Sequence, residues 1–285
     1  MCLRYFLTFS IVSFFVWYTL PAQEHTVVMA DRSANEQLCR RIIMSGVRYR
    51  TDWEYILREG VVTTEKNRTG FHRYNSEGLN YETTILNPDG TKRSIIIKEY
   101  DQDGLPVQFT EFTPQGAIVV STVYKYDEKG YLSMITEYTG QGYIVYRLSF
   151  VTNESERSVT QRTWYAPDSI ESKRVLFYSN LEKGFVKEIK DYSGERNLEM
   201  RTVIRRSEAG IISSEEIRNA EGDLLYYIDY QYTPQEWVQS KVRIYPDGSK
   251  IRQNEYNYTS TGLLTGEIEF NQKGEIVRYF KYTYD

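Results

Sequence analysis

Glycine recurs along this chain at a fixed spacing, and this spacing constrains the fold more than any other feature. Two interleaved series of turn-like segments end in glycine, at Gly78, Gly104, Gly130, Gly184, Gly210 and Gly262 and at Gly90, Gly116, Gly142, Gly222, Gly248 and Gly274. Glu156, Asp168, Arg196 and Glu236 fill the four remaining slots. The step within each series is 26 residues, except for one step of 28 that a two-residue insertion between Asp168 and Gly184 explains. The chain therefore carries eight copies of a 26-residue unit.

Each slot has the composition of a tight turn. Asn, Asp, Pro and Ser precede the glycine, which adopts positive φ without steric cost. The segments between turns are about 8 to 10 residues long, rich in Tyr, Ile, Val and Thr, and therefore typical of β-strands. Connections this short join antiparallel neighbours. We expect an all-β fold: an elongated antiparallel meander of about 16 strands in a single twisted or curled sheet, with one short N-terminal helix.

A 16-stranded outer-membrane barrel is the alternative architecture. Such a barrel needs a continuous apolar row facing the lipid. In the segment Leu263–Phe270, Glu267 or Glu269 is expected on either face, so the sequence argues against the barrel.

The first 73 residues do not follow the repeat. Residues 1–22 have the pattern of an export signal, with Arg4 before an apolar run from Tyr5 to Leu20, and an uncleaved membrane anchor is the alternative. Residues 23–73 are expected to cap the first edge of the sheet, with a helix near 34–45 and irregular strands at 47–60 and 61–74.

Composition excludes several classes of function. The net charge of −4 argues against a nucleic-acid partner, and loss of Arg4 with the signal makes it more negative. Without Cys2, Cys39 is the one remaining thiol, so no internal disulfide is expected. His72 has the position of a residue on the sheet surface. No metal-ligand cluster or nucleophile motif is visible, so we predict no catalytic residues, no metal and no cofactor.

The repeat has a recognisable form. The segments Tyr124–Leu132 (YKYDEKGYL), Glu99–Leu105 (EYDQDGL) and Tyr245–Gly248 (YPDG) resemble the YD repeats of bacterial rearrangement-hotspot and wall-associated proteins. The resemblance spans residues 74–285 and implies a β-hairpin array. Exported MORN-like repeat proteins are a looser likeness. The unit is longer than the usual YD unit and no toxin domain follows, so the resemblance does not imply a toxin-enclosing shell.

Aromatic residues are the candidate binding residues. Tyrosines recur six and four positions before the first-series turns, and two tryptophans could extend their rows. The set is Tyr124, Tyr126, Tyr230, Tyr232, Tyr256, Tyr258, Trp164 and Trp237. Such rows serve either as cross-strand packing or as a platform for glycan rings or a partner's apolar strip.

These observations favour an exported, non-catalytic repeat protein of the bacterial cell envelope that serves as a binding or scaffold surface for another envelope protein. A carbohydrate-binding module that uses the tyrosine rows is the alternative, and a glycan-active enzyme is the third. The expected location is periplasmic, outer-membrane-associated or extracellular, with no membrane span in the mature chain. The sequence leaves the oligomeric state open.

Overall fold

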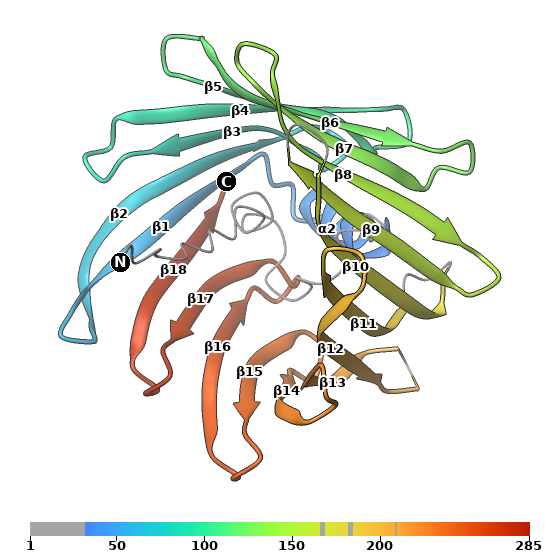
Figure 1. Ribbon diagram of the computed structural model, residues 1–285. Helices are drawn as coiled ribbons and strands as arrows, with labels where there is room; N and C mark the ends of the chain where they lie inside the picture. The colour runs from blue at the N-terminus through green and yellow to red at the C-terminus, as the bar shows by residue number, and fades with distance from the viewer. Residues whose placement is uncertain (1–31, 166–168, 182–184, 209) are drawn as a thin grey trace, which may run out of the picture.

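In the part of the chain that the structure describes, the protein is a closed antiparallel β-barrel of 18 strands with one helix (Figure 1). The computed structural model describes residues 32–165, 169–181, 185–208 and 210–285. The expected export signal at 1–22 and the turn slots Asp168 and Gly184 lie outside these residues.

The elements follow one another around the barrel in chain order. The first ten are α2 (Arg32–Met44), β1 (Tyr49–Arg58), β2 (Val61–Tyr74), β3 (Asn80–Leu86), β4 (Lys92–Tyr100), β5 (Pro106–Phe112), β6 (Ile118–Tyr126), β7 (Leu132–Thr139), β8 (Ile144–Asn153) and β9 (Ser158–Tyr165). The others are β10 (Ser169–Asn180), β11 (Phe185–Ser193), β12 (Asn197–Arg206), β13 (Ile212–Asn219), β14 (Leu224–Tyr232), β15 (Val238–Ile244), β16 (Lys250–Tyr258), β17 (Leu264–Phe270) and β18 (Ile276–Tyr284).

Closure of the ring corrects the expected open sheet of about 16 strands. Strand β1 pairs with β2 on one side and with β18 on the other, with Asp52 opposite Tyr282. Residues 49–74 therefore do not cap a sheet edge. They add two strands that join the two edges of the array, and each described strand then has two neighbours. Closure removes the edges that an open sheet would have to protect.

The two glycine series lie at opposite ends of the barrel, because successive turns of an antiparallel meander alternate between ends. In the hairpin that follows β4, the Asp101 N–H donates to the Leu105 carbonyl and the Gly104 N–H donates back to the Asp101 carbonyl, at 2.9 and 3.1 Å. The Asp101 carboxylate also accepts the N–H groups of residues 103 and 105. The Asp side chain thus caps the turn, and Gly104 has a φ of +75°, which glycine adopts without steric cost.

Helix α2 packs on the end that carries the first glycine series, which we call the helix end. Arg41 donates to the Gly262 carbonyl at 3.1 Å, and Ile42 is 1% exposed against Tyr74 and Leu263. A side chain at Gly78 would lie 2.6 Å from the Cys39 carbonyl oxygen, so this turn must be glycine for the helix to approach. The turns of the second series form the far end.

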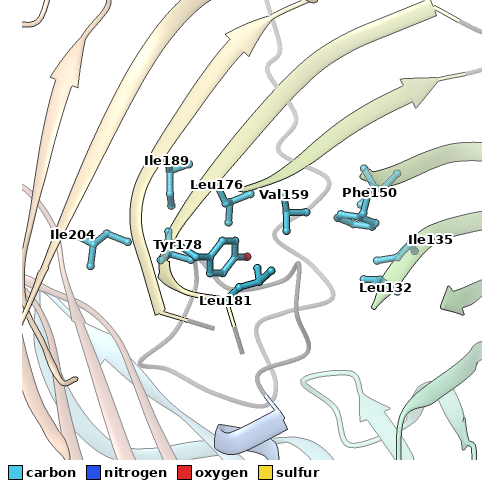
Figure 2. Close-up of a cluster of buried hydrophobic side chains, with 11 residues drawn as sticks. Leu132, Ile135, Phe150, Val159, Leu176, Tyr178, Leu181, Ile189 and Ile204 are labelled. Carbon is cyan, nitrogen blue, oxygen red and sulfur yellow. The ribbon is translucent and has the colours of Figure 1, made fainter. Parts of the chain in front are cut away.

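Buried apolar side chains line the inside of the barrel towards the helix end (Figure 2). Leu176 and Tyr178 on β10 are 0% and 1% exposed and lie beside Val159 and Ile189 on the adjacent strands. Side chains alternate between the two faces along a strand, and directly paired residues on neighbouring strands point to the same face. Following the pairing from these buried residues therefore shows which residues of each strand face the inside of the barrel. By that register Glu267 and Glu269, two residues apart on β17, both face inward, so the expectation that they occupy either face was wrong.

Candidate functional site

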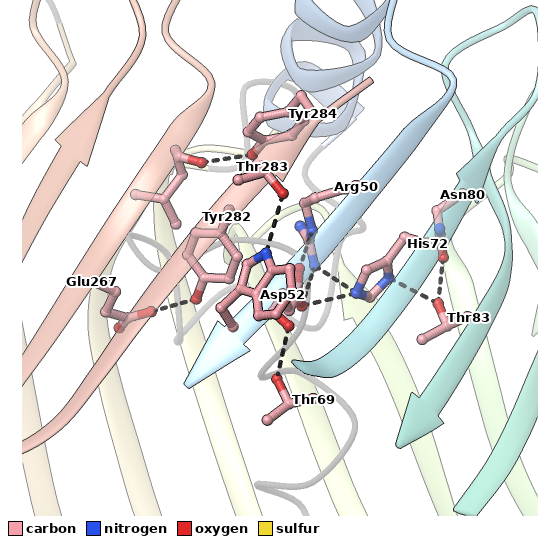
Figure 3. A network of polar contacts seen from close by, with 12 residues as sticks. Arg50, Asp52, Thr69, His72, Asn80, Thr83, Glu267, Tyr282, Thr283 and Tyr284 are labelled. Carbon is pink, nitrogen blue, oxygen red and sulfur yellow. Dashed lines mark hydrogen bonds and ion pairs between the residues drawn. The ribbon is translucent and has the colours of Figure 1, made fainter. Parts of the chain in front are cut away.

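Charged side chains are buried on the inner face where β1 meets its neighbours (Figure 3). Arg50 and Asp52 lie two residues apart on β1, and the Arg50 Nε donates to Asp52 Oδ1 at 2.8 Å. The His72 Nε2 on β2 lies 2.8 Å from Asp52 Oδ2 and 3.0 Å from Arg50 Nη2. The other imidazole nitrogen lies 3.0 Å from Thr83 Oγ1, and Thr83 donates to Asn80 Oδ1 at 2.9 Å. We call these five residues the closure network.

The electrostatics of the network follow from burial and from the guanidinium. Burial alone would raise the pKa of Asp52, but Arg50 and His72 lower it to about 2. Burial, reinforced by the Arg50 charge and opposed by Asp52, lowers the pKa of His72 to about 4. At neutral pH the network therefore holds an Arg50–Asp52 ion pair beside a neutral imidazole.

The order carboxylate, imidazole, hydroxyl is that of a nucleophile triad, so an enzymatic role needs a direct test against the geometry. Thr83 is 2% exposed, and its proton is donated to Asn80 rather than to the imidazole. The imidazole nitrogen that faces Asp52 also contacts Arg50, and a pKa of about 4 makes His72 a poor general base near neutral pH. The geometry favours a structural network that ties three strands together.

His72 was expected on the sheet surface, and that expectation was wrong, since its side chain is 2% exposed. The network also reaches β18 and β17. The Arg50 guanidinium lies 5.2 Å from the ring centroid of Tyr282, and the Tyr282 hydroxyl lies 3.3 Å from Glu267 Oε2. The Arg50-x-Asp52 pair could have signalled the site, since residues two apart share a strand face.

The six predicted tyrosines lie on the inner face near the helix end, on β6, β14 and β16. Tyr230 and Tyr256 are 9% and 4% exposed. Tyr230 donates to Glu215 Oε1 at 2.8 Å, and Tyr124 lies 5.1 Å from Phe109 between ring centroids. These rings therefore pack inside the barrel.

Four tyrosines that lie four positions before a first-series slot share a structural task, and Tyr284 has the same task. The hydroxyl of each donates to the backbone carbonyl 20 residues earlier, at the start of the neighbouring strand; we call this contact the tyrosine latch. The donor–acceptor pairs are Tyr100–Asn80, Tyr126–Pro106, Tyr232–Ile212, Tyr258–Val238 and Tyr284–Leu264. Arg206 stands at the tyrosine position in the repeat copy that ends at Gly210. Its guanidinium Nε makes the equivalent contact with the Val186 carbonyl at 3.4 Å. The latch explains the spacing between the tyrosine and the glycine.

The two predicted tryptophans do not extend the tyrosine rows as one surface. Trp164 on β9 points outward and donates to Ser149 Oγ at 3.1 Å. Trp237 lies in the turn between β14 and β15, 5.4 Å from Tyr258 and 5.7 Å from Arg41. Trp237 therefore belongs to the packing between helix and barrel.

The described residues contain no group of three His, Cys, Asp or Glu side chains that could hold a metal ion. Over the same ranges, no helix has the length and apolar character needed to cross a membrane.

The outer wall formed by β9 to β13 carries an unusual arrangement of charge. Lys190, Arg201 and Arg218 lie directly opposite one another on three adjacent strands, an arrangement that is destabilising by itself. Glu188 pairs with Lys190 and Arg201, at 3.5 and 2.6 Å.

The same two-to-one arrangement recurs twice on this wall. Glu216 pairs with Arg205 and Arg218. Glu195 pairs with Arg162 and Lys173. We call these nine residues the charged wall; its six cations and three carboxylates leave a surplus of three positive charges on a chain whose net charge is −4.

Comparison with known proteins gives no family for the chain. No family model and no curated protein matches it. Among solved structures, porin-like proteins from Bacteroides uniformis and Bacteroides vulgatus are similar. The first has 11% identity and a TM-score of 0.32, covering 84% of this chain and 96% of that one. The second has 10% identity and a TM-score of 0.39, covering 67% and 94%.

A third similar structure is TcdB2-TccC3 without its hypervariable C-terminal region, at 8% identity and a TM-score of 0.25, covering 75% of this chain and 17% of that one. Likenesses at these identities and TM-scores establish neither a family nor a function for this chain.

Proposed function

We propose that this chain is an exported, non-catalytic protein of the bacterial cell envelope that binds another envelope protein through the charged wall. The observation that carries the proposal is the row Lys190, Arg201 and Arg218, held in register across three strands. Like charges in directly opposed positions cost stability, and a partner that brings acidic side chains to the row removes that cost.

The geometry of the ion pairs supports binding from outside. Two of the three carboxylates lie low on the wall, with 17% of the Glu188 side chain and 19% of the Glu216 side chain exposed, whereas 41% of the Glu195 side chain is exposed. The cations that pair with Glu188 and Glu216 reach further, with 45% of the Arg201 side chain and 63% of the Arg205 side chain exposed. Each carboxylate is shared by two cations, so guanidinium donors remain for carboxylates of a partner.

The tyrosine rows are turned inward, so the proposal rests on the charged wall and not on them. The non-catalytic reading is supported by the closure network, in which the hydroxyl and the imidazole are both buried and mutually bonded.

Site-specific photo-crosslinking tests the proposal. A photoreactive amino acid replaces Val203, which lies on the outer face of β12 opposite Glu188 and Glu216. The control position is Val277, which is 44% exposed on β18. We expect an envelope protein with an acidic crosslinked peptide from the first position only, and a yield that falls with salt because exposed charges are screened.

The matched variants are Arg201→Glu with Arg205→Glu on the charged wall and Arg73→Glu elsewhere on the outer face, where Arg73 also pairs with a glutamate. The double variant should lose the crosslink and Arg73→Glu should keep it. Equal yields from both variants, or recovery of polysaccharide or lipid alone, would overturn the proposal.

A further inference from the structure

A lysine and an asparagine lie side by side on the inner face of the barrel, on strands that are not part of the charged wall. Lys241 on β15 lies directly opposite Asn254 on β16. Lys241 also lies opposite Tyr230 on β14, whose ring packs inside the barrel, so both side chains point inward. Directly opposed residues have Cβ atoms about 4.5–5.5 Å apart, so the long lysine side chain can reach the asparagine amide.

The amine of Lys241 lies in a largely buried position without a carboxylate partner. The residue is 7% exposed, and its amine makes no ion pair and no hydrogen bond within the described part of the chain. The amine lies over the Tyr230 ring, 5.7 Å from the ring centroid. An amine attacks in its neutral form, which a neighbouring carboxylate would disfavour. Lys241 therefore has the surroundings of a lysine that can act as a nucleophile.

Acidic side chains lie beside Asn254 on the other neighbouring strand. Glu267 and Glu269 face inward on β17, and Glu269 lies directly opposite Asn254. The Asn254 side-chain Nδ2 donates to Glu267 Oε1 at 3.5 Å. The Tyr282 hydroxyl lies 3.3 Å from the other oxygen of Glu267, as Figure 3 shows. The Asn254 amide thus lies between the strand that carries an amine and the strand that carries a proton acceptor.

We propose that Lys241 and Asn254 form an intramolecular isopeptide bond, with Glu267 as the group that transfers the proton. Rotation of the lysine side chain away from Tyr230 brings the neutral Nζ to Asn254 Cγ, which it attacks. The new bond from Nζ to Cγ replaces the bond from Cγ to Nδ2. Glu267 takes the proton that the amine loses and gives a proton to Nδ2, which leaves as ammonia. The products are one secondary amide and one ammonia, and the step needs no oxidant or reductant.

The bond is independent of the charged wall. Lys241, Asn254 and Glu267 lie on the inner face of β15 to β17, whereas the wall lies on the outer face of β9 to β13. Absence of the bond would therefore leave the proposed partner binding intact, and loss of partner binding would leave the bond intact.

Peptide mapping of the full chain by mass spectrometry tests the bond. An amide on Nζ prevents trypsin from cutting after Lys241. We expect a branched pair of residues 219–243 and 253–273, lighter by one ammonia than the two peptides together. Recovery of a peptide that ends at Lys241 without any branched pair would overturn the assignment, and so would a loss of ammonia confined to residues 253–273.

Two variants and a control assign the roles within the bond. Lys241→Arg keeps the positive charge and removes the attacking amine, so the branched pair should be lost completely. Glu267→Gln should slow its formation about a hundredfold or more, measured as the linked fraction against time after synthesis. An unchanged rate in this variant would overturn the role of Glu267. Lys125→Arg, at an exposed lysine opposite Met134, should form the branched pair like the parent protein.

Discussion

Removing the hydroxyl of one tyrosine latch isolates its contribution to the barrel. Tyr258 donates to the Val238 carbonyl at 2.8 Å, and its ring lies 5.4 Å from that of Trp237. Tyr258→Phe deletes the donor and keeps the ring, so the aromatic contact should survive.

The magnitude follows from what the deletion leaves behind. The Val238 carbonyl loses a part-buried donor, and the net cost of one such hydrogen bond is about 1 kcal/mol. Tyr100→Phe on strand β4 removes the hydrogen bond to the Asn80 carbonyl in the same way. The two sites share no partner, so the double variant should lose about 2 kcal/mol of unfolding free energy.

Urea denaturation followed by tyrosine and tryptophan fluorescence measures these differences. The control is Tyr143→Phe, because Tyr143 is 73% exposed and its hydroxyl makes no hydrogen bond to a described residue; its effect should stay within about 0.5 kcal/mol. If the double variant loses no more than this control, the latch does not stabilise the barrel, and the spacing of tyrosine and glycine needs another explanation.

The remaining predictions concern the closure network, a strained turn and the helix. Below pH 6.5 His72 is protonated in the unfolded chain before it is protonated in the folded protein, so stability should fall towards pH 4, and it should fall further from pH 3.8 to about 2 through Asp52; urea titrations in which His72→Gln has the same pH profile as the parent protein would contradict this. Asp52→Ala leaves Arg50 buried without its carboxylate and should cost about 3–5 kcal/mol, measured by the same titration, and a cost below about 1 kcal/mol would count against the ion pair. Glu236 has a φ of +64°, so Glu236→Gly should raise the unfolding free energy by roughly 0.5–1 kcal/mol, and a decrease would show that the turn is not strained. Ile42→Ala should cost about 2–5 kcal/mol in thermal unfolding, unless helix α2 contributes nothing to the fold.

The local structure of the array is well determined by its sequence. The glycines that end the turns of both series have positive φ wherever the structure describes them, as at Gly104 and Gly248. Where a glutamate takes the place of glycine at position 236, the backbone keeps the left-handed conformation. These features depend on a few adjacent residues, so turn chemistry is enough to predict them.

Closure of the barrel depends on contacts that no local pattern encodes. Strand β1 lies outside the glycine register, and its pairing with β18 joins residues from opposite ends of the described chain. The closure network is also hidden in the sequence, because Asp52 and His72 become neighbours only through the pairing of β1 with β2.

The sequence alone also could not predict that the tyrosine rows point into the barrel. A row of aromatic residues on one face of an open sheet is accessible to a ligand, whereas the same row inside a closed barrel is a packing layer. The sequence pattern is the same in both arrangements, and they differ only in whether the sheet curves into a closed barrel.

Pairing of β1 with β18 has a consequence for how the protein reaches its native state. The hairpins of the array can form one after another from local contacts, but the last pairing must bring together strands separated by almost the whole described chain. Contacts of such high sequence separation are slow to form. Until then both strands present unpaired N–H and C=O groups, which makes the nearly complete barrel the species most exposed to joining with another copy. The time during which this species can join with another copy is set by the rate at which β1 pairs with β18.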